Sequence, residues 1–255
     1  MPKKLPDFII GGAPRSGTTW LYRVLDLHPQ IYLAKPLQPE PKFFLVADLY
    51  RRGIQYYQET WFAEAPPEKM AGEKSTNYLE SATTAMRLQE HLPRVKLIFI
   101  LREPVGRAFS NYLWSKTNKM ENEDFETALA LEQERERSLP PRLRFARPHA
   151  YFSRGLYADL LAPFFARFPR TNILCLPLDL LAEAPEAFLE RVHRFLEVEL
   201  RPQDCAGVGL INATEGEHSQ TIRPETRERL KQAYADANRR LVDLLGEDFR
   251  RWLDL

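Results

Sequence analysis

The sequence predicts an α/β protein with a single P-loop-like domain, in which a central, mostly parallel sheet is flanked by helices. Short apolar runs alternate with stretches whose apolar residues recur at helical spacing. The run VKLIFIL at 95–101 is continuously apolar and rich in β-branched residues, as in a strand that is buried on both faces. We expect this run to be the central strand, with ligands bound beyond the carboxyl ends of the strands.

The N-terminal part of the chain begins with a predicted strand at residues 7–12, which ends in glycines. A tight loop follows, and then a helix that Pro29 ends. Residues 30–34 predict a second short strand. The proline-rich segment 35–44 predicts a loop, and we expect the aromatic stretch that continues to Phe62 to be irregular or weakly helical.

The remaining elements continue the alternation of strands and helices. The charged segment near 121–137 predicts an exposed helix, and a mobile loop is expected to follow it at 138–150. Other helices are expected at 81–91, from Pro104 through Tyr112, and at 154–168, 185–196 and 224–245. A further strand is expected at 172–176.

Composition predicts one domain over residues 1–255, because 44% hydrophobic content supports a substantial core and no linker or repeat interrupts the chain. The net charge of +1 gives no general attraction for nucleic acid or for an anionic membrane. The start MPKKLPDFIIGG fits neither a signal peptide nor a membrane span, so we expect a cytoplasmic protein. Cys175 and Cys205 lack metal-ligand spacing and are expected to be reduced and structural.

A first anion site is predicted at residues 12–19, Gly-Ala-Pro-Arg-Ser-Gly-Thr-Thr. The Gly-x-x-x-x-Gly frame lets backbone N–H groups approach an anion at a helix N-terminus. Thr18 stands where a nucleotide triphosphatase has lysine, and the cation is Arg15 within the loop. With the hydroxyls of Ser16, Thr18 and Thr19, this arrangement suits a compact 5′-phosphosulfate.

A second anion site is predicted after the strand at 95–101, where Arg102 leaves the strand and Ser110 lies two helical turns further on. Alone, Arg102 is better explained by a surface salt bridge with Glu103 or Glu73. Together with the loop at 12–19, it indicates a nucleotide that carries one anionic group at its 5′ position and another at its 3′ position.

FIIGGAPRSGTTWL and KLIFILREPVGRAFSNY resemble the signature by which sulfotransferases bind 3′-phosphoadenosine 5′-phosphosulfate (PAPS), and the resemblance runs from about residue 7 to the C-terminus. It implies metal-free transfer of a sulfuryl group from PAPS to a hydroxyl or amine of a glycan or small-molecule acceptor, with PAP as product. LDLHPQIYLA, EPKFF and GEKSTNYL are similar to the heparan sulfate N- and 3-O-sulfotransferases and their bacterial relatives. Arg15 resembles the loop cation of tyrosylprotein sulfotransferases, so the subgroup stays open.

Glu40 is the predicted general base, because the resemblance places a carboxylate three residues before a Phe-Phe pair. Its flanking prolines and aromatics are expected to hold and partly desolvate it. The resemblance assigns Lys74 to the sulfuryl group or the bridging oxygen, together with Arg15. Lys42 is either an acceptor contact or a solvated lysine.

Further contacts to the nucleotide are implied by the resemblance. Trp20 is either a core residue or an adenine platform, His28 is expected to cap a helix, and His218 or Ser219 in the loop 212–220 is a weaker candidate. The predicted nucleotide-binding residues are Arg15, Ser16, Gly17, Thr18, Thr19, Trp20, Arg102, Ser110, Arg154, Gly155 and Tyr157.

Two other functions fit parts of the sequence. A P-loop kinase that phosphorylates a small acceptor with ATP predicts a lysine after Gly17 and an acidic metal ligand at a strand end. A nucleotide-binding or scaffold module without catalysis would keep the two anion sites but lose the base and the cations near the leaving group, whereas Glu40, Lys74 and Arg15 are all present. The acceptor is expected to be selected by residues 35–62 and 138–152, and its identity and the oligomeric state stay open.

Overall fold

The computed structural model describes residues 4–209 and 221–254 of the chain. By packing, the chain divides into two compact units. The first comprises Met1–Leu101 and Leu161–Ile211, and the second comprises Arg102–Leu160 and Asn212–Leu255. A single domain over residues 1–255 therefore stays a prediction.

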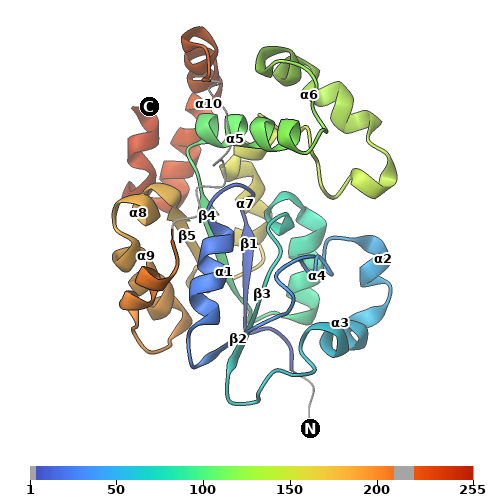
Figure 1. Cartoon of the computed structure of the whole chain (residues 1–255), viewed down its shortest axis with the longest axis vertical. Coiled ribbons are helices and arrows are strands. Elements are labelled where there is room, and N and C mark those ends of the chain that lie inside the picture. The colour runs from blue at the N-terminus through green and yellow to red at the C-terminus, as the bar shows by residue number, and fades with distance from the viewer. Residues whose placement is uncertain (1–3, 210–220, 255) are drawn as a thin grey trace. The chain divides into compact units, whose positions relative to one another are not determined.

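The first unit contains a five-stranded sheet, which Figure 1 shows as arrows. All neighbouring strands pair in parallel, in the order β2-β3-β1-β4-β5. This confirms the predicted α/β class. The strands are β1 (Phe8–Gly12), β2 (Ile31–Leu33), β3 (Met70–Lys74), β4 (Lys96–Leu101) and β5 (Ile173–Pro177).

The prediction that residues 95–101 form the central strand is wrong, because β1 occupies the centre and β4 lies beside it. Both strands are buried almost throughout, so continuous apolarity does not distinguish them. The two strands pair side by side, with Phe8 opposite Lys96 and Gly12 opposite Phe99.

Sequence analysis missed the strand β3, because its residues Met-Ala-Gly-Glu-Lys contain no apolar run. The strand nevertheless lies between β2 and β1, with Glu73 opposite Ile9 and Lys74 opposite Ile10. Both charged side chains are buried. β3 therefore brings two ionisable groups to the end of the sheet.

One apolar core joins the sheet to three helices of the first unit. Phe8 and Ile10 of β1 and Ile98 and Ile100 of β4 pack in it with side chains of α1, α8 and α9. The helices of this unit are α1 (Thr18–Asp26), α2 (Ala47–Tyr50), α3 (Gly53–Trp61), α4 (Ala82–His91), α8 (Leu178–Glu183) and α9 (Pro185–Leu196), with short 3₁₀ turns η1 (Tyr78–Glu80), η4 (Arg170–Asn172) and η5 (Pro202–Gly207).

The stretch expected to be irregular or weakly helical forms the helices α2 and α3. Tyr57 of α3 is fully buried, and its ring stacks on that of Phe43 with centroids 4.6 Å apart. This aromatic packing supplies tertiary stabilisation that short helices of ordinary propensity lack.

The second unit is mainly helical. Its core includes Val105, Tyr112, Phe125, Tyr151 and Tyr234. Its elements are α5 (Pro104–Thr117), α6 (Phe125–Ser138), η2 (Pro141–Leu143), η3 (Ser153–Gly155), α10 (Pro224–Leu245) and η6 (Glu247–Leu253), and α7 (Tyr157–Phe165) continues from this unit into the first. The helix expected from residue 154 begins at Tyr157, after the turn η3.

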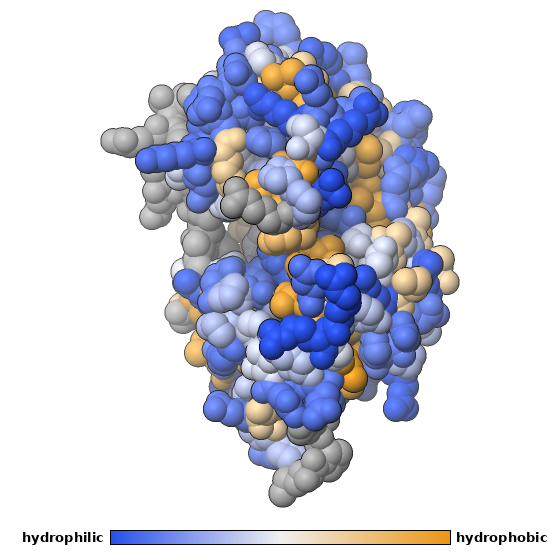
Figure 2. Space-filling view, turned by 90° about the vertical axis from the view of Figure 1, so that its right-hand side faces the viewer, coloured by the Kyte–Doolittle hydropathy of each residue, from blue (hydrophilic) through white to orange (hydrophobic). Residues whose placement is uncertain are grey.

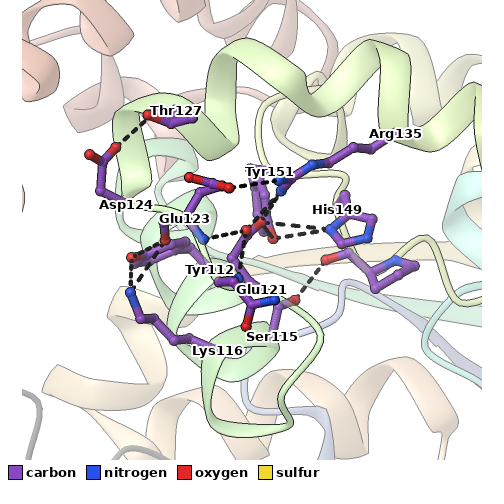
Figure 3. A network of polar contacts seen from close by, with 12 residues as sticks. Tyr112, Ser115, Lys116, Glu121, Glu123, Asp124, Thr127, Arg135, His149 and Tyr151 are labelled. Atoms are coloured by element: carbon purple, nitrogen blue, oxygen red, sulfur yellow. Dashed lines mark hydrogen bonds and ion pairs between the residues drawn. The ribbon is translucent and has the colours of Figure 1, made fainter.

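α6 begins at Phe125 rather than at the expected residue 121, because the side chain of Asp124 caps it by accepting from Thr127 N at 2.8 Å. The side chain of Glu121, just before this helix, is fully buried. It accepts hydrogen bonds from Arg135 Nη1 at 2.6 and 2.8 Å and from Tyr151 Oη at 2.7 Å (Figure 3). These donors hold the pKa of Glu121 below its usual value, although burial opposes them.

On the face drawn in Figure 2, hydrophilic residues predominate and hydrophobic residues form separate small patches. Among the described residues, the large hydrophobic side chains that are clearly exposed are Leu27, Met86, Leu200 and Leu253. None of the helices within residues 4–209 and 221–254 has the length and apolar character needed to cross a membrane.

Replacing Glu121 with glutamine is expected to lower the free energy of unfolding at pH 7 by about 2–3 kcal/mol, because hydrogen bonds to a buried charge are lost. The folded-state pKa is depressed, so this contribution is present above the ordinary carboxyl pKa and is lost as pH falls through the folded value. Urea unfolding at pH 7 and in acid measures both effects. The control is Glu123→Gln, which removes a half-exposed partner of Arg135 and should cost less than about 1 kcal/mol. Equal losses in the two variants would contradict the assignment.

Candidate active site

The glycine-rich loop joins β1 to α1 in the first unit, as predicted. Gly17 is the N-cap of α1 with φ 81°, and a Cβ there would lie 2.9 Å from Leu178 Cδ1 and 3.1 Å from Leu181 Cδ2. Backbone conformation and space both require glycine at this position. No side chain caps the first turn of α1, so its N–H groups suit an anion.

The other loop residues differ in exposure. Ser16 and Thr18 are buried, while Arg15 and Thr19 are half-buried. Trp20 lies in the core, where its Nε1 donates to the Val208 carbonyl at 3.0 Å and its ring contacts that of Phe188 edge-on. The structure therefore supplies a packing role for Trp20, and its contact with adenine stays a prediction.

Glu40 and Lys74, predicted from separate segments, form a buried ion pair. Lys74 Nζ donates to Glu40 Oε1, and the two side chains are 2% and 5% exposed. Thr76 donates to the same carboxylate from its backbone N at 3.2 Å and from its hydroxyl at 3.2 and 3.3 Å. Lys42 Nζ lies 3.6 Å from Glu40 Oε2. The carboxylate is thus surrounded by donors and cations.

Two hydrogen bonds attach the loop that carries Glu40 to the segment after β3. The backbone N of Lys42 donates to Ser75 Oγ at 2.9 Å, and that of Phe44 donates to Tyr78 Oη at 3.2 Å. Ser75 and Tyr78 thus anchor the loop that carries Glu40.

The glycine-rich loop begins beside this ion pair. A Cβ on Gly12 would lie 2.8 Å from Leu79 Cβ and 3.0 Å from the Thr76 carbonyl, and Ser75 N donates to the Ile10 carbonyl at 3.1 Å. The first unit therefore brings the start of the glycine-rich loop and the Glu40–Lys74 pair together.

In the second unit, Arg102 directly follows the last residue of β4 and lies against the first turn of α5. Its Nε is 3.6 Å from the position that a Cβ on Gly106 would take. Glu103 caps α5 instead of forming the ion pair weighed above, since its carboxylate accepts from Val105 N and Gly106 N, both at 2.7 Å. Burial lowers the pKa of Arg102, and Tyr157 and Glu103 oppose this shift.

Arg107 is a second cation near Arg102, and sequence analysis missed it. Its side chain is fully buried, Nη2 donates to the Tyr151 carbonyl, and neither Nε nor Nη1 has a hydrogen-bond partner among the residues that the structure describes. Its charge contributes to the lowered pKa of Arg102. The sequence does show a second arginine five residues after Arg102, but an arginine in a predicted helix is usually exposed to solvent, so its burial was not expected.

The second unit contains further residues that were predicted to bind the nucleotide, and two of them donate hydrogen bonds within this unit. Ser110 is buried on α5. Arg154 donates to Asn111 Oδ1 at 2.9 Å and to the Ala146 carbonyl at 2.5 Å. The Tyr157 hydroxyl donates to the Arg102 carbonyl at 2.8 Å, which fixes the backbone of Arg102.

Gly155 gives space to Tyr234, because a Cβ there would lie 2.7 Å from Tyr234 Cε1. His28 is buried after α1, and its Nε2 lies 3.0 Å from the Glu199 carbonyl. His218, Ser219 and the rest of 212–220 lie outside the described residues. Within residues 4–209 and 221–254, no group of three or more His, Cys, Asp or Glu side chains is arranged to hold a metal ion.

The parallel sheet and the glycine-rich loop before α1 define an α/β protein of the P-loop type. The chain belongs to the sulfotransferase domain family, whose pattern it matches over residues 5–238. It is 26% identical to heparan sulfate glucosamine 3-O-sulfotransferase 3B1 of Mus musculus over 97% of this chain and 65% of that protein. It is 30% identical to the human bifunctional heparan sulfate N-deacetylase/N-sulfotransferase 3 over 76% of this chain. The chain thus spans less than two thirds of the first relative and 22% of the second.

Solved structures agree with this assignment. A sulfotransferase from Alicyclobacillus acidocaldarius superposes with a TM-score of 0.80 at 27% identity, covering 98% of this chain and 99% of the other. Mouse sulfotransferase SULT7A1, crystallised with PAP, has a TM-score of 0.61 at 15% identity, covering 98% of this chain and 87% of its own, and shares the fold.

The Glu40–Lys74 pair predicts a strong energetic coupling. Lys74→Met is expected to lower the free energy of unfolding by about 3–5 kcal/mol, because it leaves a buried carboxylate without its main counter-charge. Glu40→Gln combined with Lys74→Met should cost less than the sum of the single changes, which urea unfolding of the four proteins measures. Additive losses would show that the two groups do not interact.

Proposed function

We propose that this protein transfers a sulfuryl group from PAPS to a hydroxyl or amine of an acceptor, with Glu40 as general base. The buried Glu40–Lys74 pair beside the start of the anion-binding loop carries this proposal. It supplies a proton acceptor and a cation next to the segment that suits the 5′-phosphosulfate. Membership of the sulfotransferase family supports this chemistry over phosphoryl transfer from ATP.

The reaction follows from these groups as an in-line displacement. The acceptor oxygen or nitrogen attacks sulfur, the bond from sulfur to the bridging phosphate oxygen breaks, and its electron pair stays on PAP. The acceptor proton passes to Glu40. Lys74 and Arg15 stabilise the charge that develops on the sulfuryl and bridging oxygens. No redox step occurs.

The nucleotide is recognised through both of its anionic positions. Residues 12–19 bind the 5′-phosphosulfate with backbone N–H groups and hydroxyls. Arg102 and Ser110 bind the 3′-phosphate, and the buried charge of Arg107, whose Nε and Nη1 have no hydrogen-bond partner in the described part of the chain, strengthens this site. PAP in the mouse sulfotransferase is consistent with such a ligand.

The acceptor's reacting group has to reach the carboxylate of Glu40, whose side chain is 5% exposed. The names of the relatives indicate a sulfated glycan as the first acceptor class to test. Lys42, close to Glu40, is placed to contact an anionic acceptor.

Glu40→Gln is expected to reduce kcat for sulfuryl transfer by about 10²–10⁴-fold, because the amide cannot take the acceptor proton. PAP binding, measured by calorimetry, should change by no more than a few-fold. Glu59→Gln, an exposed change on α3, is the control and should retain both properties. Unchanged transfer in Glu40→Gln would remove the base assignment, and binding of magnesium-ATP without PAP would overturn sulfuryl transfer altogether.

Arg102→Gln should weaken PAP binding by about 10- to 100-fold, since a hydrogen bond to a charged group contributes about 1.5–3 kcal/mol. Its affinity for AMP, which lacks the 3′-phosphate, should hardly change. Arg15→Gln should weaken both nucleotides. Calorimetric titration of the three proteins with PAP and AMP checks this pattern, and equal losses for both ligands in Arg102→Gln would contradict the 3′ assignment.

A further inference from the structure

A pocket of about 830 Å³ lies in the second unit, where α6, the segment that follows it and α10 line it together. Its volume is in the range of small-molecule sites, which are usually apolar with a few polar groups that orient the ligand. None of the described residues assigned above to the nucleotide or to catalysis lines this pocket. It is therefore a separate feature of the second unit.

One part of the lining is apolar and continues into the core of this unit. Leu230 of α10 belongs to that core, and Leu129 of α6 and Phe152 pack against it. The ring of Phe152 stacks on that of Tyr234 with centroids 4.5 Å apart, and the Tyr234 hydroxyl donates to the Phe152 carbonyl at 2.8 Å. The apolar side chains along the pocket are those of Leu129, Ala130, Leu139, Phe152, Leu230 and Ala233. An apolar ligand therefore meets a surface that the core already holds in place.

Both glutamates of the lining are bound by donors. Glu132 accepts from the backbone N atoms of residues 152 and 153 at 2.5 and 2.9 Å. Glu136 accepts from Arg147 Nε at 3.2 Å and from His149 N at 3.1 Å. These bonds attach the segment after α6 to the helix itself. They also offset the negative charge of the two carboxylates, which reduces the repulsion of an anionic ligand.

Positive charge exceeds negative charge around the pocket. Its lining contains the four arginines Arg137, Arg144, Arg147 and Arg229. Arg147 pairs with Glu136. The other three are exposed, and in the described part of the chain no carboxylate pairs with them. Guanidinium groups beside an apolar surface suit a ligand that has an apolar body and an anionic end.

We propose that this pocket binds a soluble organic anion, whose apolar chain lies along the apolar lining and whose carboxylate contacts the arginines. The inference goes beyond the proposed function and does not depend on it, because it concerns residues of the second unit that take no part in the transfer assigned to Glu40. Its tests measure binding alone.

The first test is calorimetric titration of the natural protein with decanoate, hexanoate and decyltrimethylammonium, all below the concentrations at which they form micelles. Decanoate is expected to bind about tenfold more tightly than hexanoate, or more, because its longer chain buries more apolar surface. It should also bind at least about tenfold more tightly than decyltrimethylammonium, which has the same chain but a charge that the arginines repel. Equal affinity for the anion and the cation would overturn the proposal.

The second test uses variants at exposed positions of α10, where folding tolerates change. Arg229→Gln should weaken decanoate binding by about 5- to 10-fold, because a charged donor is lost. Ala233→Phe should weaken it by at least about tenfold, because the larger side chain fills part of the pocket. The matched control is Arg227→Gln, an exposed change on the same helix outside the lining, which should leave the affinity unchanged. Urea unfolding verifies that all three variants fold. Unchanged affinity in both Arg229→Gln and Ala233→Phe would overturn the proposal.

Sedimentation of the natural protein tests the alternative occupant, a second copy of this chain. The proposal predicts that decanoate does not change the oligomeric state. A dimer that both decanoate and Ala233→Phe dissociate would assign the pocket to self-association and overturn the proposal.

Discussion

The first unit depends on one constraint, the need to compensate the charge of Glu40 in a nearly closed environment. Burial of an ion pair is tolerated only when further donors satisfy the carboxylate, and here Lys74 and Thr76 provide them. Those two residues lie at the end of β3 and directly after it, so the strand must hold its register against β1 for the pair to form. The Glu40–Lys74 ion pair therefore depends on the register of the sheet.

The two units differ in how their buried cationic side chains are paired. In the first, Lys74 is paired with a carboxylate. In the second, the buried guanidinium of Arg107 donates to a backbone carbonyl, and within residues 4–209 and 221–254 its Nε and Nη1 have no partner. A paired cation is suited to stabilising charge that develops during a reaction, whereas donors without a partner suit a permanent anion such as a phosphate.

Patterns of hydrophobic residues predicted the elements that are apolar or bounded by proline. The helices 185–196 and 224–245 were predicted with their observed ends, since Pro185 and Pro224 mark first turns. β3 escaped prediction because it buries a glutamate and a lysine, and the partner of the lysine, Glu40, comes from a distant segment. The order of strands in the sheet also depends on pairing between strands, which apolarity alone does not encode. Motif spacing predicted the loop 12–19, and the family resemblance predicted Glu40 and Lys74, but the anchoring roles of Ser75 and Tyr78 and the buried Arg107 appear only in three dimensions.

The aromatic contact between Tyr57 and Phe43 has a consequence for how specificity can change. α2 buries none of its residues and α3 buries only Tyr57, so their outward positions carry little of the packing. Under the proposed function, substitutions on these two short helices can change which acceptors approach Glu40. The carboxylate of Glu40 itself stays in place. Directed evolution toward new acceptors would do best to vary this outer layer and to leave the aromatic contact beneath it unchanged.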